Sequence, residues 1–244
     1  MLRNQSNKLF LELMVKSGVS FFTKNQPNNY YIVQKKIETE SKLSNNLQLE
    51  DIVTIKELSN YINRSDKCLL KNSAKKTVIA DGNPASKLMI IGEAPGVEED
   101  KMGKPFVGEA GKLLDKMLNF IFLSRSKNFY ITNIVFWRPP GNRTPNNQEI
   151  NVCLPYVKEH INIISPQLII LLGNIAAKSL LQTDQGITKI RGKKFFYFDN
   201  ENNLKIETVP IFHPAYLLRN PIEKKHIWED LKNIYEIIKK KEIL

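Results

Sequence analysis

The feature that most constrains the fold is an alternation of short apolar segments with amphipathic ones, which starts near residue 75. The segments "KLMIIG" (87–92) and "PQLIILLG" (166–173) hold nearly continuous apolar runs, as strands buried on both faces of a parallel sheet do. Between them, "GKLLDKMLNFIF" (111–122) carries its apolar residues at helical spacing. Strands that alternate with helices predict an α/β fold with helices on both faces of a parallel sheet. Ligands of such folds bind at the carboxyl ends of the strands.

The same alternation continues to the end of the chain. It predicts further strands at 128–137, 193–198 and 204–212, and further helices at 146–164 and 224–240. The first of these helices is expected to begin at Asn146 or Asn147, because asparagine is a favoured N-cap and acidic residues follow it.

The first part of the chain lacks this alternation. Residues 1–60 are predicted to form an extension, and residues 61–244 the main domain. Within the extension, "NKLFLELMVKSG" (7–18) has helical spacing and ends at a glycine, and "TIKELSNYIN" (54–63) has the pattern of a short helix.

The composition favours a polyanionic partner. Lys and Arg outnumber Asp and Glu by 36 to 25, which gives a net charge of +11. A basic surface suits nucleic acid or an anionic membrane surface, although a general enrichment in lysine would give the same charge. Two cysteines indicate no disulfide framework and favour a reducing cytoplasm. No apolar run approaches the roughly 20 residues that a membrane span needs.

The loop after the first strand, "GEAPGVEEDKMGKPFVGEAG", combines glycines with acidic residues. Gly92 and Gly96 allow the backbone to approach a ligand closely. Glu93 lies directly at the strand exit, and Phe106 is an apolar residue within a polar loop. Each also has a purely structural interpretation, since a carboxylate often caps a helix and a loop phenylalanine often fills the core.

Two later strand ends also carry polar groups. Asn133 lies within a predicted strand, where a buried amide must find partners. "RPPGNRTP" (138–145) is a positively charged loop before a helix N-terminus, which suits a phosphate or is an ordinary capped turn. His213, in "FHPAYLLRNP", lies at another strand exit, whereas His160 and His226 fall within predicted helices and are interpreted as packing or surface residues.

Taken in order, the motifs "GEAPGVEEDKMGKPFVGEAGKLLDKML", "TNIVFWRPPGNRTP", "LLG" and "HPAYLLRNP" resemble those of the family 4 uracil-DNA glycosylases. The resemblance covers about residues 65–240. It implies a three-layer α/β/α fold with a central four-stranded parallel sheet. It also implies a monofunctional DNA glycosylase, which hydrolyses the N-glycosidic bond of uracil in DNA and initiates base excision repair.

The resemblance implies a role for individual residues, acting on a base flipped out of the duplex. Phe106 matches the position whose ring stacks on the base. Asn133 matches the position that reads the base edge, donating to uracil O4 and accepting from N3–H, which cytosine cannot satisfy. His213 would donate a hydrogen bond to uracil O2 and stabilise the uracil anion. Glu93 would face the sugar cation and orient a water, while Glu99 is expected to order the loop.

The resemblance also implies contacts with the DNA backbone and the duplex. Leu217 or Leu218 would wedge into the gap left by the flipped base, and Arg219 would contact phosphate. Further candidates for phosphate contact or loop ordering are Arg138, Asn142 and Arg143; helix N-terminal structure is the alternative for these three.

Many members of this family hold a [4Fe–4S] cluster with four cysteines. The matching positions here are Ser65, Cys68, Trp137 and Cys153, so only two are cysteines. Four thiolates are the usual ligand set, and the sequence therefore predicts neither a cluster nor any other cofactor or metal. Trp137 is expected to fill the vacated space, and Cys68 and Cys153 to lie close together as reduced, buried thiols.

Alternative functions stay open from sequence alone. The same site would suit a glycosylase for other deaminated bases, such as hypoxanthine or xanthine, and the fold would suit a non-catalytic DNA-binding relative. A generic nucleotide-binding protein is disfavoured because the G-x-G-x-x-G and G-x-x-x-x-G-K fingerprints are missing from the sequence. The expected partner is uracil-containing DNA, bound by a cytoplasmic monomer that does not contact a membrane and hands its product to downstream repair proteins.

Overall fold

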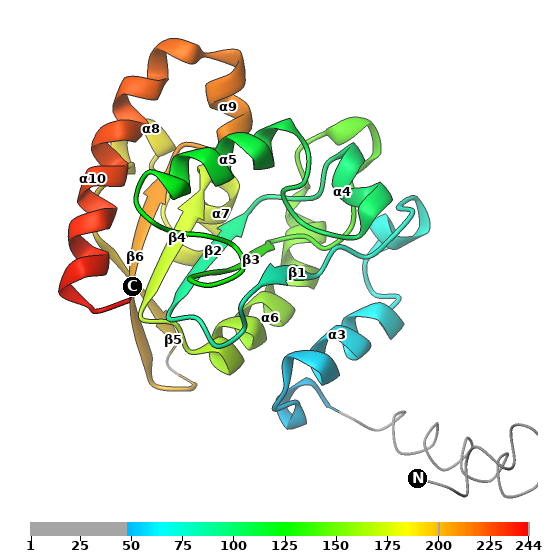
Figure 1. Cartoon of the computed structure of the whole chain (residues 1–244). Helices are drawn as coiled ribbons and strands as arrows, with labels where there is room; N and C mark the ends of the chain where they lie inside the picture. Colours follow the sequence, from blue (N-terminus) through cyan, green and yellow to red (C-terminus); the bar gives the residue numbers. More distant parts are fainter. Residues whose placement is uncertain (1–47, 200, 244) are drawn as a thin grey trace, which may run out of the picture. The chain divides into compact units, whose positions relative to one another are not determined.

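The sheet at the centre of the protein has six strands in the order β1-β3-β2-β4-β6-β5. The structure, a computed structural model, describes residues 48–199 and 201–243 (Figure 1). The helix predicted at 7–18 lies outside the described residues. The strands are β1 Ala80–Gly82, β2 Leu88–Gly92, β3 Tyr130–Asn133, β4 Leu168–Leu172, β5 Phe195–Asp199 and β6 Leu204–Ile211.

The four central strands confirm the predicted parallel sheet. Strand β2 pairs in parallel with both β3 and β4, and β4 pairs in parallel with β6. The two edge strands, β1 and β5, run antiparallel to their neighbours and extend this sheet on both sides. Figure 1 shows that the carboxyl ends of the parallel strands lie together at one end of the sheet, on the side of the short helices α4 and α9.

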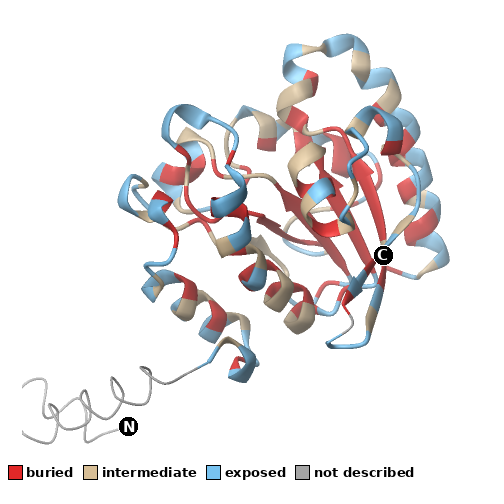
Figure 2. Ribbon diagram, turned by 180° about the vertical axis from the view of Figure 1, so that it is seen from behind, coloured by how far each residue is buried: buried red, intermediate tan, exposed pale blue. Residues whose placement is uncertain are grey.

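Alternate residues of each central strand face two separate apolar cores. In β2, Met89 and Ile91 belong to one buried cluster, whereas Leu88 and Ile90 belong to the other. Both pairs are fully buried, which explains why the strand is apolar at every position. Figure 2 shows the resulting layers, with red strands between helices that are only partly exposed.

The helices divide between the two faces of the sheet. The first cluster packs against α3, α6 and α7, and the second against α5, α9 and α10. The helix bounds are α3 Ile55–Arg64, α4 Val97–Met102, α5 Glu109–Asn119, α6 Asn147–Ile164, α7 Gly173–Leu181, α8 Ile187–Ile190, α9 Pro214–Arg219 and α10 Lys224–Lys240, with short 3-10 helices at η1 Leu49–Asp51, η2 Leu69–Asn72, η3 Pro140–Asn142 and η4 Pro221–Glu223.

The end of strand β3 differs from the sequence-based expectation, whereas the start of helix α6 agrees with it. The strand predicted at 128–137 ends at Asn133, after which Ile134 and Val135 donate their N–H groups to the carbonyls of Gly92 and Glu93 outside the strand pairing. The helix expected to begin at Asn146 or Asn147 begins at Asn147, with Asn146 as its N-cap, which confirms that prediction.

Helix α3 spans the predicted boundary between the extension and the main domain. Leu58, on one side of residue 60, and Ile62, on the other, are both fully buried in the first apolar cluster. The compact unit that contains them starts at Gln48. The structure therefore places α3 with the main domain. Among the described helices, none is long and apolar enough to span a bilayer.

Candidate active site

A pocket of about 420 Å³ lies at the carboxyl ends of the parallel strands. The predicted site residues that line it together are Glu93, Gly96, Phe106, Asn133, Asn142, Arg143, His213 and Arg219. Four other predicted residues are not part of its lining: Gly92, Arg138, Leu217 and Leu218. The pocket thus collects side chains from loops after β2, β3 and β6, where ligands of parallel sheets bind.

Asn133 lines the pocket and carries a buried amide oxygen without a hydrogen-bond partner. The residue ends strand β3 and is 1% exposed, yet its Oδ1 atom has no hydrogen-bond partner. Gly92, next to it in the sheet, leaves room for this arrangement, because a Cβ atom there would overlap both Asn133 Oδ1 and the Phe106 ring. A buried acceptor without a partner is costly unless a ligand supplies a donor. Asn133 is therefore suited to a hydrogen-bonding ligand.

Phe106 forms one wall of the pocket. Its backbone has a φ of 54°, in the left-handed region that non-glycine residues rarely adopt, and its side chain is 6% exposed. The ring centre lies 5.7 Å from that of His213. An aromatic face held against a small cavity is suited to stacking on a flat ligand.

His213 is held as a neutral imidazole with a defined tautomer. It is the N-cap of α9, and its Nδ1 atom accepts a hydrogen bond of 3.2 Å from the backbone N–H of Ala215. Burial, aided by the nearby charge of Arg219, lowers the pKa of His213 to about 4. At neutral pH the single ring proton is therefore on Nε2, which makes that nitrogen a hydrogen-bond donor.

Glu93 and Arg219 form the charged part of the pocket. Glu93 is partly buried, and this burial raises the pKa of its carboxyl group above the ordinary value, while the positive charge of Arg219 acts in the opposite direction. Arg219 is exposed at the end of α9. The pocket therefore combines a carboxylate, a neutral imidazole, an unpaired amide and an aromatic ring.

The loop at 138–145 is ordered by its own side chains. Arg138 donates through Nε to Asn142 Oδ1 at 2.7 Å. Arg143 donates to both carboxylate oxygens of Glu149, at 2.6 and 2.8 Å, and Glu149 also accepts from the backbone N–H of Asn146 at the start of α6. Asn142 and Arg143 both reach the pocket, so their loop-ordering contacts also shape its rim.

Leu217 and Leu218, the two wedge candidates, have opposite environments. Leu217 is fully buried in the second apolar cluster, whereas Leu218 is 44% exposed. Only Leu218 of this pair presents its side chain to solvent.

Glu99 holds the loop between α4 and α5. It is buried, and its two carboxylate oxygens accept hydrogen bonds from the backbone N–H groups of Gly96, Val107 and Gly108. The spacing of a helix-opening glycine and a glutamate three residues later is the available sequence signal for this cap. Two further residues were not expected from the sequence. Thr144 lines the pocket, and Arg125 contacts residues that are distant in sequence, so no local pattern indicates it.

Comparison with known proteins identifies the family of the chain. The family model described as the uracil DNA glycosylase superfamily matches residues 79–232. The chain is 40% identical over 190 residues to the type-4 uracil-DNA glycosylase of Saccharolobus solfataricus, covering 76% of this chain and 87% of that protein. The corresponding protein of Sulfurisphaera tokodaii is 40% identical over 70% of this chain and 79% of its own length. That of Thermotoga maritima is 35% identical over 75% of this chain and 94% of its own.

These relatives correct the prediction that the protein has no cofactor. Type-4 uracil-DNA glycosylases usually carry an iron–sulfur cluster, so the prediction of none, drawn from four positions alone, is wrong for a chain with this ancestry. The error lay in giving two substituted positions more weight than the similarity of the whole domain.

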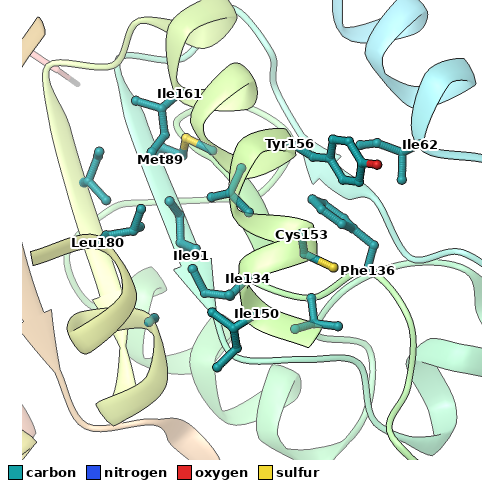
Figure 3. Close-up of a cluster of buried hydrophobic side chains, with 14 of the residues drawn as sticks. Ile62, Met89, Ile91, Ile134, Phe136, Ile150, Cys153, Tyr156, Ile161 and Leu180 are labelled. Carbon is teal, nitrogen blue, oxygen red and sulfur yellow. The ribbon is translucent and has the colours of Figure 1, made fainter. Parts of the chain in front are cut away.

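The residues present supply only part of a four-cysteine site. Cys68 and Cys153 are free, buried thiols, and the interaction with Cys153 lowers the pKa of Cys68 to about 7. Trp137 is buried in the same cluster and donates through Nε1 to Thr77 Oγ1, while the Ser65 hydroxyl pairs with that of Tyr156 at 2.7 Å (Figure 3 shows Cys153 in this cluster). No other His, Cys, Asp or Glu in the described part of the chain completes a group of three. Cys68 and Cys153 therefore provide two of the four thiolates that such a cluster usually takes.

The fold, the pocket and the relatives agree. The central parallel sheet and the pocket residues Glu93, Phe106, Asn133 and His213 lie within the matched segment. The matched relatives are covered over 79–94% of their own length. This chain belongs to the uracil-DNA glycosylase superfamily and, within it, to the type-4 uracil-DNA glycosylases.

Proposed function

We propose that the protein removes uracil from DNA by hydrolysing its N-glycosidic bond, and so initiates base excision repair. The observation that carries this proposal is the unpaired Oδ1 of Asn133 in a pocket that also holds an aromatic wall, a neutral imidazole and a carboxylate. Since a base within a duplex is inaccessible, the target nucleotide must be flipped into the pocket, at a cost of a few kcal/mol.

Asn133 provides the base specificity. Its unpaired Oδ1 accepts from uracil N3–H, and its Nδ2 group donates to uracil O4. Cytosine presents an acceptor and a donor at these two places, so it leaves the amide unsatisfied. A buried polar mismatch of this kind discriminates by about 10⁴-fold.

Phe106 and His213 act on the flipped base. The Phe106 ring stacks on it, which is worth roughly 1–3 kcal/mol per base. His213 donates from Nε2–H to uracil O2, where negative charge develops as the bond to the sugar breaks. Because the pKa of His213 is lowered to about 4 by burial and by Arg219, it acts as a neutral donor and keeps its proton.

Glu93 acts on the sugar side of the breaking bond. Its carboxylate faces the developing sugar cation and orients the water that attacks it, as carboxylates do in other glycosidic hydrolyses. The positive charge of Arg219 favours the ionised form of Glu93 against the effect of burial.

The surface around the pocket holds the DNA. Arg219, exposed beside the pocket, contacts a phosphate, and Leu218 rather than the buried Leu217 wedges into the gap left by the base. The loop that runs along the DNA backbone is supported by Arg138, Asn142 and Arg143. The enzyme acts as a monomer in the cytoplasm and leaves an abasic site, which downstream repair enzymes must process.

A strand-cleavage assay tests the proposal. A labelled duplex carrying one uracil is incubated with the protein and then treated with hot alkali, with a thymine-containing duplex as the control. Cleavage of the uracil duplex only after alkali is expected, because a monofunctional glycosylase leaves an intact abasic strand. Duplexes with hypoxanthine or xanthine test the alternative substrates, and cleavage of those alone contradicts the assignment to uracil.

A further inference from the structure

We propose that Arg125 is a positioning residue of the reaction, which fixes the Phe106 ring as the stacking wall of the pocket. This inference rests on the proposed function, because it assigns a task to Phe106 that only base binding requires. Arg125 does not line the pocket. Any effect on catalysis must therefore pass through the loop that it holds.

The backbone at Phe106 needs an external constraint. Its φ of 54° lies in a region that is sparsely populated for residues with a side chain. Directly behind it, α5 comes so close to the Phe106 carbonyl group that a Cβ atom at Gly111 would overlap it. The ring is buried between this loop and Gly92, so a small rotation of the backbone would move the wall of the pocket.

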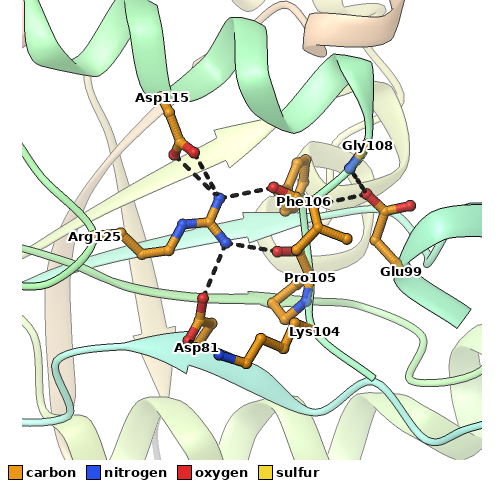
Figure 4. A network of polar contacts seen from close by, with 9 residues as sticks. Asp81, Glu99, Lys104, Pro105, Phe106, Gly108, Asp115 and Arg125 are labelled. Atoms are coloured by element: carbon orange, nitrogen blue, oxygen red, sulfur yellow. Dashed lines mark hydrogen bonds and ion pairs between the residues drawn. The ribbon is translucent and has the colours of Figure 1, made fainter. Parts of the chain in front are cut away.

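Arg125 supplies that constraint from one side. Its Nη1 donates to the carbonyl of Pro105 at 2.7 Å, and its Nη2 donates to the carbonyl of Phe106 at 2.8 Å. One rigid guanidinium thus holds two consecutive carbonyl groups around the strained residue (Figure 4). A lysine has no planar fork to reproduce this pair of bonds.

Glu99 holds the same loop from the other side. Its Oε1 accepts from the N–H of Val107 at 2.9 Å and from that of Gly108 at 2.8 Å. A cation therefore binds the carbonyls up to Phe106, and an anion binds the N–H groups after it. The two side chains fix the direction of the chain on both sides of the ring.

Two carboxylates fix the guanidinium itself. Asp81, on the edge strand β1, lies 3.1 Å from Nη1, and Asp115, on α5, lies 3.1 Å from Nη2. Arg125 is 19% exposed, so its four partners leave it little freedom. The network links an edge strand, a helix and the Phe106 loop. Loss of any of these partners is therefore expected to shift the guanidinium, and with it the Phe106 ring.

The test is a double-mutant cycle between Arg125→Met and Phe106→Ala. Three quantities are measured for the wild type, the two single variants and the double variant. They are kcat on uracil-containing duplex, inhibition by free uracil and affinity for abasic duplex. Arg125→Met is expected to lower kcat by about 10²-fold, the cost of misplacing a positioning group by about 1 Å. It should also weaken inhibition by uracil while leaving affinity for abasic duplex unchanged.

The cycle distinguishes a positioning role from a structural one. In the Phe106→Ala background, removal of Arg125 should cause no further loss of kcat, because the group it positions is gone. Independent, additive losses would overturn the inference, as would wild-type kcat and uracil inhibition in Arg125→Met. A wild-type protein that neither cleaves uracil duplex nor binds uracil would instead overturn the proposed function, and the inference with it.

Arg191→Met is the matched control. Arg191 has the same exposed fraction, 19%, and likewise bonds to a carboxylate, Asp230, and to a backbone carbonyl, that of His226, but it does not line the pocket or touch the Phe106 loop. It should lose thermal stability without losing uracil inhibition. If Arg125→Met does not fold, Asp115→Asn keeps the arginine and loosens it; unchanged kcat and uracil inhibition in that variant would contradict the proposal.

Discussion

The pocket and the first apolar cluster, which packs against α3, α6 and α7, each enclose a histidine. The two histidines differ in what surrounds them. Burial lowers the pKa of both His213 and His160 to about 4. His160 is completely enclosed, stacks on Phe136 with ring centres 5.6 Å apart, and bonds through Nδ1 to the carbonyl of Tyr156. His213 lines an open cavity instead. A lowered pKa therefore marks burial in both regions, and the open cavity distinguishes the histidine that we propose to be catalytic.

The contrast extends to their polar side chains. At the pocket, Asn133 Oδ1 is buried without a partner. Four residues later, at the cluster, Trp137 Nε1 is paired with Thr77. The cluster also holds buried polar atoms without a partner, Tyr130 Oη and His160 Nε2, but neither residue lines the pocket. Of these three unpaired groups, only that of Asn133 belongs to a residue that a substrate in the pocket can contact. Substitutions in the two regions should thus separate catalysis from stability.

Replacement of Asn133 should have the largest effect. Asn133→Leu removes the amide that reads the base edge, so kcat/KM on uracil duplex is expected to fall by about 10⁴-fold. The free energy of unfolding should stay unchanged or rise, because a buried acceptor without a partner has been removed. Steady-state kinetics and urea unfolding measure the two quantities. A large loss of stability with preserved kcat/KM would show that Asn133 contributes to packing and not to base recognition.

The opposite pattern is expected for Ile62 in the apolar cluster (Figure 3). Ile62 is fully buried on α3, so Ile62→Ala should lower the free energy of unfolding by about 2–5 kcal/mol. Below the unfolding transition kcat should match that of the wild type. Ile222→Ala, at a site 74% exposed, is the control and should change stability little. Wild-type stability of Ile62→Ala would show that α3 is not part of the cooperative domain.

The histidine pair gives the most direct comparison. His213→Ala removes the donor to uracil O2 and should lower kcat by about 10²–10³-fold, as removal of one oxyanion donor does. His160→Phe keeps the aromatic packing against Phe136 and should retain wild-type kcat. Equal losses in both variants would mean that His213 acts through packing and not through its ring proton.

Much of this architecture could be predicted because it depends on local pattern. The alternation of Met89 and Ile91 with Leu88 and Ile90 fills two cores, so a continuous apolar run was a reliable signal of a central strand. The edge strand β1 has only the letters "ADG" and no apolar pattern, and it forms through pairing with β3. Tertiary contact, rather than local sequence, creates that strand.

The candidate site shows the same division. The strand-exit residues Glu93, Asn133 and His213 were predicted because a parallel sheet brings its carboxyl ends together. Arg125 was not predicted because its partner Asp81 is 44 positions away, and no residue pattern near Arg125 indicates this bond. Leu217 and Leu218 could not be separated before α9 was placed on its apolar core.

The smallest effect is expected for substitution of Arg219. It distinguishes the effect of the Arg219 charge on the pocket from direct contact of its side chain with phosphate. Its positive charge lowers the pKa of both Glu93 and His213. The proposed mechanism needs Glu93 ionised and His213 neutral, so activity is expected to fall as the pH drops through either pKa. Arg219→Gln raises both pKa values, and the acid limb of the kcat/KM profile should therefore move to higher pH.

Two comparisons separate this effect from phosphate binding by the same side chain. Arg219→Lys keeps the charge and should keep the acid limb near that of the wild type, even if KM changes. High salt screens charges at an exposed site, so the difference between Arg219→Gln and the wild type should shrink as salt is added. Superimposable profiles for all three proteins, with only KM altered, would confine Arg219 to the DNA surface and leave burial as the dominant control on the pocket's protonation.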